Sequence, residues 1–313
     1  MASGPVSRAK ADAENENADP KDSSTVEGWR AEQAVNDRVR PSALTVFEIV
    51  RREGAEEMTR PAASLFWSGI AAGFALAFSL AVSGMMTAIL EPGPARDLIK
   101  PFGYVTGFVI VVFGRLQLFT ENTIAAILPL AANFTRSNAY RMGRLYLIVL
   151  SANLIGAALS AIVLSFLPVM KPEHLAGAME VARHAMEPGF FETMALGVPA
   201  GFLVAAMVWM LPTAKGGEFF IVVTIIYILG LGEFAHVIVG AVEVGVLVLA
   251  GEKNNLAGIG GFILPALIGN MIGGTALFAM LAYAQIRDET RQAKQDEAKQ
   301  DGAGQDGAKN DQV

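Results

Sequence analysis

The stretch LGLGEFAHVIVGAVEV, from Leu229 to Val244, places ionisable side chains inside a long apolar run. The three groups are Glu233, His236 and Glu243. An ionisable side chain in hydrocarbon costs about 3 kcal/mol on insertion scales, so such groups face a bundle interior or a water-filled path and mark functional sites. The stretch therefore predicts a membrane protein with a site buried in one of its membrane segments.

Five further apolar runs accompany this one, and each is long enough to cross a hydrocarbon core that needs about 20 helical residues. The composition agrees, with 53% hydrophobic and 17% charged residues. Two runs carry polar interruptions: the second contains GRLQLFTENT and the fifth contains GEFAHVIVG. We therefore expect an all-α membrane protein with six transmembrane helices, of which the second and fifth are broken. The runs cover residues 64–90, 102–132, 143–169, 192–212, 218–250 and 257–286.

The two ends of the chain are polar and differ from the middle. We expect disordered cytoplasmic tails at 1–40 and 287–313, because neither can bury enough apolar surface to become ordered. Residues 41–60 predict an amphipathic interfacial helix, and residues 61–286 a six-span pore domain. Lys and Arg are twice as frequent on the side that holds both ends, which predicts that both termini are cytoplasmic.

The two halves of the membrane region resemble each other. GIAAGFALA (Gly69–Ala77) matches GVPAGFLVA (Gly197–Ala205), and NLIGAA (Asn153–Ala158) matches NMIGGT (Asn270–Thr275). Three spans per half turn the second half upside down, which makes an inverted repeat, and such proteins place their site at the midplane between broken helices. We expect the two interruptions to face each other.

The six spans, the LFT element of the second and the F-x-H element of the fifth resemble the formate/nitrite transporter family, in particular its YfdC-like inner-membrane branch. The resemblance covers about residues 41–286. It implies an aquaporin-like fold, a homopentamer in the bacterial inner membrane and one pore per protomer for a small monovalent anion, such as formate or nitrite, or its protonated acid. The pore residues that it implies are Leu118, Phe119, Thr120, Asn122, Phe234 and His236.

Several positions depart from the family pattern. Gln117 replaces an acidic residue before LFT, Arg115 replaces a glycine, and Glu121 replaces a small residue. The serine and asparagine that commonly follow the histidine are missing, and a lysine of the outer vestibule falls at Ala185. An acidic group beside the path repels anions, so a pore for a neutral or cationic solute, or a protein that has lost the pore, remains an alternative.

The chemistry expected at the midplane follows from the cost of a bare charge in low dielectric. Helix N-termini supply partial positive charge, and His236 donates a hydrogen bond or, if protonated, a full charge. Proton transfer from His236 to the anion would produce a neutral acid that passes apolar side chains. Candidates for these are Leu118, Phe119, Phe108 and Tyr104, with Thr120 holding the opposite face.

The remaining charged membrane residues, Arg115, Glu121, Glu233 and Glu243, either tune selectivity or form structural pairs, with Arg115 bound to one glutamate. His174 and His184 are expected in a solvated outer loop. The histidines lack metal-ligand spacing and there is no cysteine, so no metal or cofactor is expected. No nucleophile motif, phosphate loop, Asn-Pro-Ala sequence or large basic patch occurs, which argues against an enzyme, an ATP-driven pump, a water channel and nucleic-acid binding.

Overall fold

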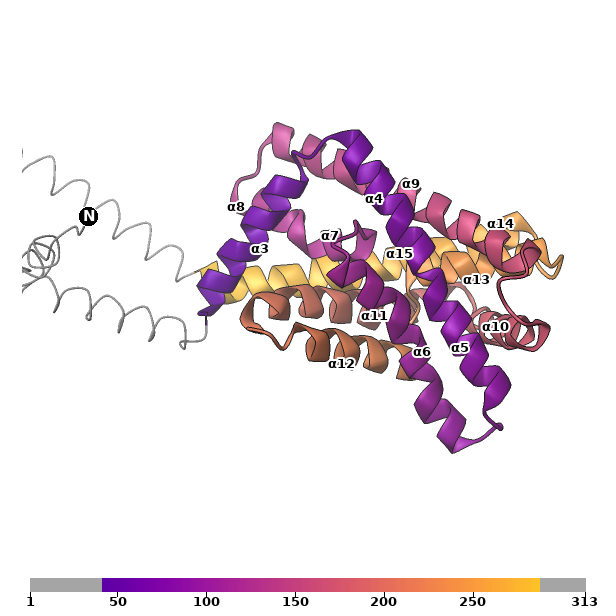
Figure 1. The fold of residues 1–313 in the computed structure, drawn as a ribbon. Coiled ribbons are helices and arrows are strands. Elements are labelled where there is room, and N and C mark those ends of the chain that lie inside the picture. The colour runs from indigo at the N-terminus through magenta and orange to yellow at the C-terminus, as the bar shows by residue number, and fades with distance from the viewer. Residues whose placement is uncertain (1–40, 288–313) are drawn as a thin grey trace, which may run out of the picture. The chain divides into compact units, whose positions relative to one another are not determined.

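The computed structural model describes residues 41–287, and within them the chain is all helical, as predicted. The two predicted tails, 1–40 and 288–313, lie outside the described residues. The helices run as follows: α3 (Ala43–Glu57), α4 (Ala62–Ala75), α5 (Ala77–Ile89), α6 (Pro94–Phe113), α7 (Phe119–Ala125), α8 (Ile127–Ala132), α9 (Arg136–Phe166), α10 (Pro172–Ala185), α11 (Phe190–Met210), η1 (Leu211–Thr213), α12 (Glu218–Leu231), α13 (Val237–Leu249), α14 (Asn255–Gly258), η2 (Ile259–Ile263), α15 (Leu264–Met271) and η3 (Ile272–Ala279) (Figure 1).

Four helical stretches among residues 41–287 are long and apolar enough to cross a membrane. They are Ala62–Ile89, Arg136–Phe166, Phe190–Thr213 and Asn255–Arg287, and they coincide with the first, third, fourth and sixth predicted spans. The second and fifth runs are each divided between shorter helices, α6 with α7 and α8, and α12 with α13. The division falls at the polar interruptions seen in the sequence.

Close helix pairs explain why glycine and alanine recur in these spans. α4 packs along α9, and α11 packs along α15. A Cβ at Gly73 would overlap the carbonyl oxygen of Asn153, and a Cβ at Gly201 would overlap that of Asn270. Small residues let the helix backbones approach this closely, as is usual between membrane helices.

Helix α3 begins within the predicted amphipathic segment. Val46, Phe47 and Val50 are buried and pack in a cluster with Ile124 and Leu128 of the helices α7 and α8. The apolar side of α3 therefore contacts the protein itself. Its role as an anchor at the membrane interface stays a prediction.

One expectation about the segment between the third and fourth spans is wrong. It was expected to be a solvated loop, but residues 172–185 form the helix α10, which packs against α5 and α13. Its buried side consists of Gly177, Ala178 and Ala182, and a Cβ at Gly177 would overlap the Gly84 carbonyl. These small residues let α10 sit directly on α5, which a loop would not do.

Candidate functional site

The two interruptions have the same backbone turn. Each passes through a left-handed residue, Arg115 at φ 52° and Glu233 at φ 50°. The N–H one residue later donates back to the preceding helix, from Leu116 to the Val111 carbonyl at 3.0 Å, and from Phe234 to the Leu229 carbonyl at 3.1 Å. A left-handed non-glycine residue is uncommon, so its recurrence at two matching positions marks two related turns.

A buried asparagine holds the first interruption in place. Asn153 of α9 accepts a hydrogen bond from the Phe119 N–H at 2.9 Å. Its amide donates to the carbonyl oxygens of Gly69 and Gln117, both at 2.8 Å. The asparagine thereby satisfies backbone groups that a broken helix leaves unpaired, which is what allows a break in a buried segment.

Asn270 of α15 does the same for the second interruption. It accepts from the Val237 N–H at 3.0 Å and donates to the carbonyl oxygens of Gly197 at 2.9 Å and Ala235 at 2.8 Å. Asn153 and Asn270 are both fully buried. The asparagine-glycine pattern of the sequence therefore marks two side chains that hold the two turns in place by hydrogen bonds. We call Asn153 and Asn270 the asparagine brackets.

Thr120 and His236 meet between the two interruptions. Thr120 Oγ1 lies 2.8 Å from His236 Nε2, and both side chains are buried. His236 is the N-cap of α13, where its Nδ1 accepts a hydrogen bond from the Val239 N–H at 3.4 Å. Because Nδ1 accepts, the proton of the neutral ring is on Nε2, and the ring donates it to the Thr120 hydroxyl.

Aromatic rings surround this pair. Phe108 contacts the His236 ring edge-on, with 5.0 Å between ring centroids, and Tyr104 stacks on Phe108 at 5.7 Å. Phe119 packs edge-on against Tyr146 at 5.4 Å. The polar pair is thus embedded in a hydrophobic layer, which strengthens its hydrogen bond and excludes water.

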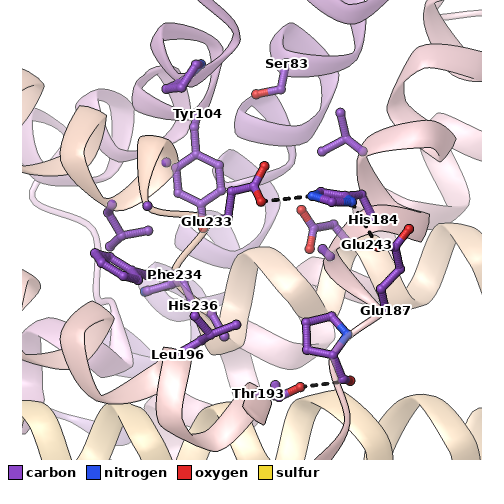
Figure 2. A pocket seen from close by; sticks show the side chains of 18 of the residues that line it. Ser83, Tyr104, His184, Glu187, Thr193, Leu196, Glu233, Phe234, His236 and Glu243 are labelled. Carbon is purple, nitrogen blue, oxygen red and sulfur yellow. Dashed lines mark hydrogen bonds and ion pairs between the residues drawn. The ribbon is translucent and has the colours of Figure 1, made fainter. Parts of the chain in front are cut away.

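A cavity of about 460 Å³ opens on one side of His236 (Figure 2). His236, Phe234 and Tyr104 line it, together with Glu233 and Glu243. The other predicted pore residues, Leu118, Phe119, Thr120 and Asn122, are buried but do not line this cavity. Asn122 instead donates to the side chain of Gln117 and to the Leu118 carbonyl, both at 3.1 Å, and so stabilises the first turn.

A charged network lies at the mouth of the cavity. Glu233 contacts Lys100 at 3.4 Å and His184 Nε2 at 2.9 Å, and His184 Nδ1 lies 3.2 Å from Glu187. The hydrogen bond from His184 to Glu233 raises the pKa of His184 above its ordinary value of 6.5. His184 is half exposed, as expected for a solvated residue, but it lies on the helix α10 and not in a loop, and it lines the cavity.

The expected pairing of Arg115 with a glutamate is also wrong. Arg115 is exposed and forms no ion pair within residues 41–287. Glu233 pairs instead with Lys100 and His184. The Oε1 atom of Glu121 is buried without a hydrogen-bond partner among these residues. The left-handed turn directs Arg115 to the surface of the protomer, from where its charge acts on Glu121 and Glu53 without contact.

Several cavity residues carry no recognisable signal in the sequence. Lys100, Glu187 and Glu192 look like ordinary polar residues near the ends of apolar runs, and only the packing of α6, α10 and α11 brings them to one cavity. Asn153 and Asn270 were visible as a repeated motif. Their bracket role could have been inferred from a buried amide beside each interrupted span.

Comparisons with known proteins identify relatives of this chain. A family model described as formate/nitrite transporter matches residues 44–284. The inner membrane protein YfdC of Escherichia coli (strain K12) is 35% identical over 261 residues, which cover 83% of this chain and 84% of YfdC. The transporter YrhG of Bacillus subtilis (strain 168) is 24% identical and covers 80% of this chain and 95% of its own length.

Two solved structures share the fold. A pentameric formate channel with formate bound superposes with a TM-score of 0.61 at 21% identity and covers 71% of this chain and 96% of its own. An ion channel of the same family superposes with a TM-score of 0.68 at 17% identity and covers 77% and 98%. At these identities the likeness concerns the fold.

Proposed function

This chain belongs to the formate/nitrite transporter family, and we propose that it forms a channel or secondary transporter for a small monovalent weak acid. The observation that carries the proposal is the buried Thr120–His236 pair at the base of the cavity, between the two interruptions. A polar pair at this depth, beside a cavity, provides a place where a small solute exchanges hydrogen bonds on its way through.

The proposed architecture has six membrane crossings in two inverted three-helix repeats, with α6–α7 and α12–α13 as the broken second and fifth helices. The matching turns and the two asparagine brackets support it, because their hydrogen bonds recur between residues about 118 positions apart. An odd number of crossings per repeat inverts the second half. The two broken helices then meet at the midplane, as in other inverted-repeat transporters.

The solute crosses the constriction in its neutral form. His236 already uses Nδ1 as an acceptor, so a second proton on the ring would oppose the Val239 N–H and the positive end of α13. A neutral ring next to Phe108 and Thr120 offers hydrogen bonds but no full charge. Neutral formic or nitrous acid suits this environment, whereas the bare anion would pay a desolvation cost.

The charge of the cavity supports the same conclusion. Among its lining residues, Glu187, Glu192 and Glu233 outnumber Lys100 and His184 even when the buried Glu243 is left out. A negative potential dilutes anions and concentrates cations, but it leaves the concentration of a neutral acid unchanged. The cavity therefore admits the protonated acid while it excludes the anion.

The same acidic lining favours a second candidate, a pore of this fold for a neutral or cationic small solute. This alternative needs no change in architecture. It differs only in which species the cavity concentrates, so transport assays separate it from the first.

The proposed setting is the bacterial inner membrane, in a homopentamer with one pore per protomer and with both termini in the cytoplasm. The name of the relative YfdC and the pentameric assembly of the formate channel support this. Large apolar side chains that are exposed on the isolated protomer, among them Phe113, Leu147 and Phe220, suit contact with lipid or with neighbouring protomers.

The test is solute uptake into proteoliposomes at two pH values, with protein-free vesicles as background. Formate, nitrite, acetate and hydrosulfide are compared with urea as a neutral control. We expect uptake of a small weak acid that rises at the lower pH in proportion to its protonated fraction. Uptake of no solute above background would contradict the proposal and favour a protein that has lost the pore.

A further inference from the structure

Glu243 is buried in the wall of the cavity without a partner. Its side chain is 5% exposed, and no hydrogen bond or ion pair to it forms within residues 41–287. It lies on α13, two helical turns beyond the N-cap His236, and it lines the cavity (Figure 2). A buried carboxylate without a partner is strongly disfavoured, so this position calls for a ligand or a proton.

The cationic side chains of the cavity are already engaged elsewhere. Lys100 and His184 both contact Glu233, at 3.4 Å and 2.9 Å. Arg183, the next cation along α10, binds Glu252 at 2.7 Å. The fold therefore supplies two contacting partners to the more exposed Glu233, whereas the more buried Glu243 feels the charge of Lys100 only from a distance.

We propose that this acidic cavity binds a small primary ammonium cation, held by the carboxylate of Glu243 with Tyr104 near it. The Tyr104 ring lines the cavity, and aromatic faces attract cations of this kind. Figure 2 shows Tyr104, Glu233, His184 and Glu243 gathered along one side of the cavity, with Phe234 and His236 further along its wall.

The chemistry of the lining favours an ammonium over a metal ion. No group of three or more His, Cys, Asp or Glu side chains within the described part of the chain has the spacing to hold a metal. A single buried carboxylate with an aromatic neighbour instead suits a monovalent cation with N–H donors. The cavity volume of about 460 Å³ leaves room for a short alkyl group as well.

The proposal rests on the proposed pore only for access to the cavity, because binding does not require the solute to pass His236. An equilibrium measurement therefore separates the two. A protein that binds an ammonium but transports no weak acid would refute the proposed function and leave the site intact, and the reverse result would refute the site alone.

The experiment is isothermal titration of the purified full chain with methylammonium at about pH 9, because a carboxyl group that is buried without a partner ionises only at a higher pH than an exposed one. Acetate and acetamide, of similar size but negative and neutral, are the matched ligands. We expect saturable binding of methylammonium and none of the other two. Equal binding of acetate or acetamide, or no saturable binding of methylammonium, would overturn the site without any variant.

Substitutions then assign the site to Glu243. Glu243→Gln keeps the shape and removes the charge, and we expect it to weaken methylammonium binding at least tenfold. Glu173→Gln removes a carboxylate from the exposed first turn of α10, outside the cavity lining, and should bind as the wild type does. If Glu243→Gln does not assemble, Glu243→Met, which is also uncharged and of similar length, replaces it, and wild-type affinity in either variant would refute the role of Glu243.

Discussion

The two interrupted segments share a backbone but not a chemistry. Residues 114–118 and 232–236 make the same left-handed turn, and each is bracketed by a buried asparagine. At the position before the second half-helix, one segment has Leu118 and the other has His236. The left-handed residues also differ, Arg115 in one and Glu233 in the other.

This difference separates what the fold requires from what the site requires. The turn needs an asparagine, a close helix contact and one residue that accepts positive φ, and both halves supply these. The histidine, Glu233 and Glu243 occur in the second half, whereas Thr120 and Lys100 of the same site come from the first. The repeat thus preserves the backbone, while the polar side chains of the site differ between the two halves.

Removing either asparagine bracket should have the largest effect. Asn153→Ala and Asn270→Ala each remove three hydrogen bonds to buried backbone groups, and at about 1 kcal/mol per bond the loss is about 3 kcal/mol. The thermal midpoint of the purified oligomer, followed by circular dichroism, measures it. Asn138→Ala, which removes one exposed hydrogen bond, is the control.

The same experiment tests whether Asn153 and Asn270 contribute equally to stability. If the two brackets are equivalent, the two alanine variants should lower the midpoint by similar amounts. A large drop of the midpoint in one variant and none in the other would mean that the matching hydrogen bonds contribute unequally to stability.

Enlarging the glycines behind the brackets should have the next largest effect. Gly73→Ala and Gly201→Ala place a methyl group against the carbonyl oxygens of Asn153 and Asn270, which forces the helices apart at a cost of about 1–3 kcal/mol. Gly143→Ala has open space around it and should be neutral or stabilising. Unfolding of the three variants in parallel shows whether close approach is what these glycines provide.

Removing the hydroxyl of Thr120 should affect transport more than stability. Thr120→Val keeps the shape but takes away the partner of His236 Nε2, at a cost of about 1 kcal/mol, or about fivefold in rate if it falls on the transport barrier. Ser160→Ala, a buried hydroxyl on α9 that bonds to its own helix, is the control. Unchanged uptake in Thr120→Val would show that the hydrogen bond between Thr120 and His236 plays no part in transport.

Breaking the network at the cavity mouth should have the smallest effect, and a pH-dependent one. The raised pKa of His184 means that its bond to Glu233 contributes stability below the ordinary value of 6.5, and that this contribution is lost as the pH rises through the raised pKa. The half-exposed side chain limits the gain to a few tenths of a kcal/mol. His184→Gln should therefore lower the thermal midpoint slightly at pH 5 and leave it unchanged at about pH 9, and the opposite trend would contradict the assignment.

The sequence alone predicted the all-helical fold, the family and the meeting of Thr120 with His236. Apolar periodicity locates the long helices because each must bury one face or cross hydrocarbon, and the repeated asparagine-glycine motif marks where helices approach. The helix α10 and its cavity residues were missed. The polar residues of α10 favour a loop between two apolar runs, and the contacts of His184 with Glu233 depend on packing between segments 49 residues apart in sequence.

The partners of the charged residues were missed for the same reason. Arg115 and Glu233 occupy matching turns, yet Arg115 faces outward while Glu233 binds Lys100. Sequence neighbours alone do not reveal this difference. Whether two charged side chains that are distant in sequence form an ion pair depends on where each side chain points. A left-handed backbone residue changes that direction locally.

The measurement that tests the central claim most directly compares weak-acid uptake by the wild type and by His236→Asn across a range of pH. Asparagine keeps a hydrogen-bond donor and acceptor but cannot carry a proton in this range. If the solute crosses as a neutral acid past a neutral ring, uptake in both proteins follows the protonated fraction of the solute, with a lower rate in the variant. If the pH dependence disappears in His236→Asn, His236 transfers the proton itself, and the account of a neutral constriction is wrong.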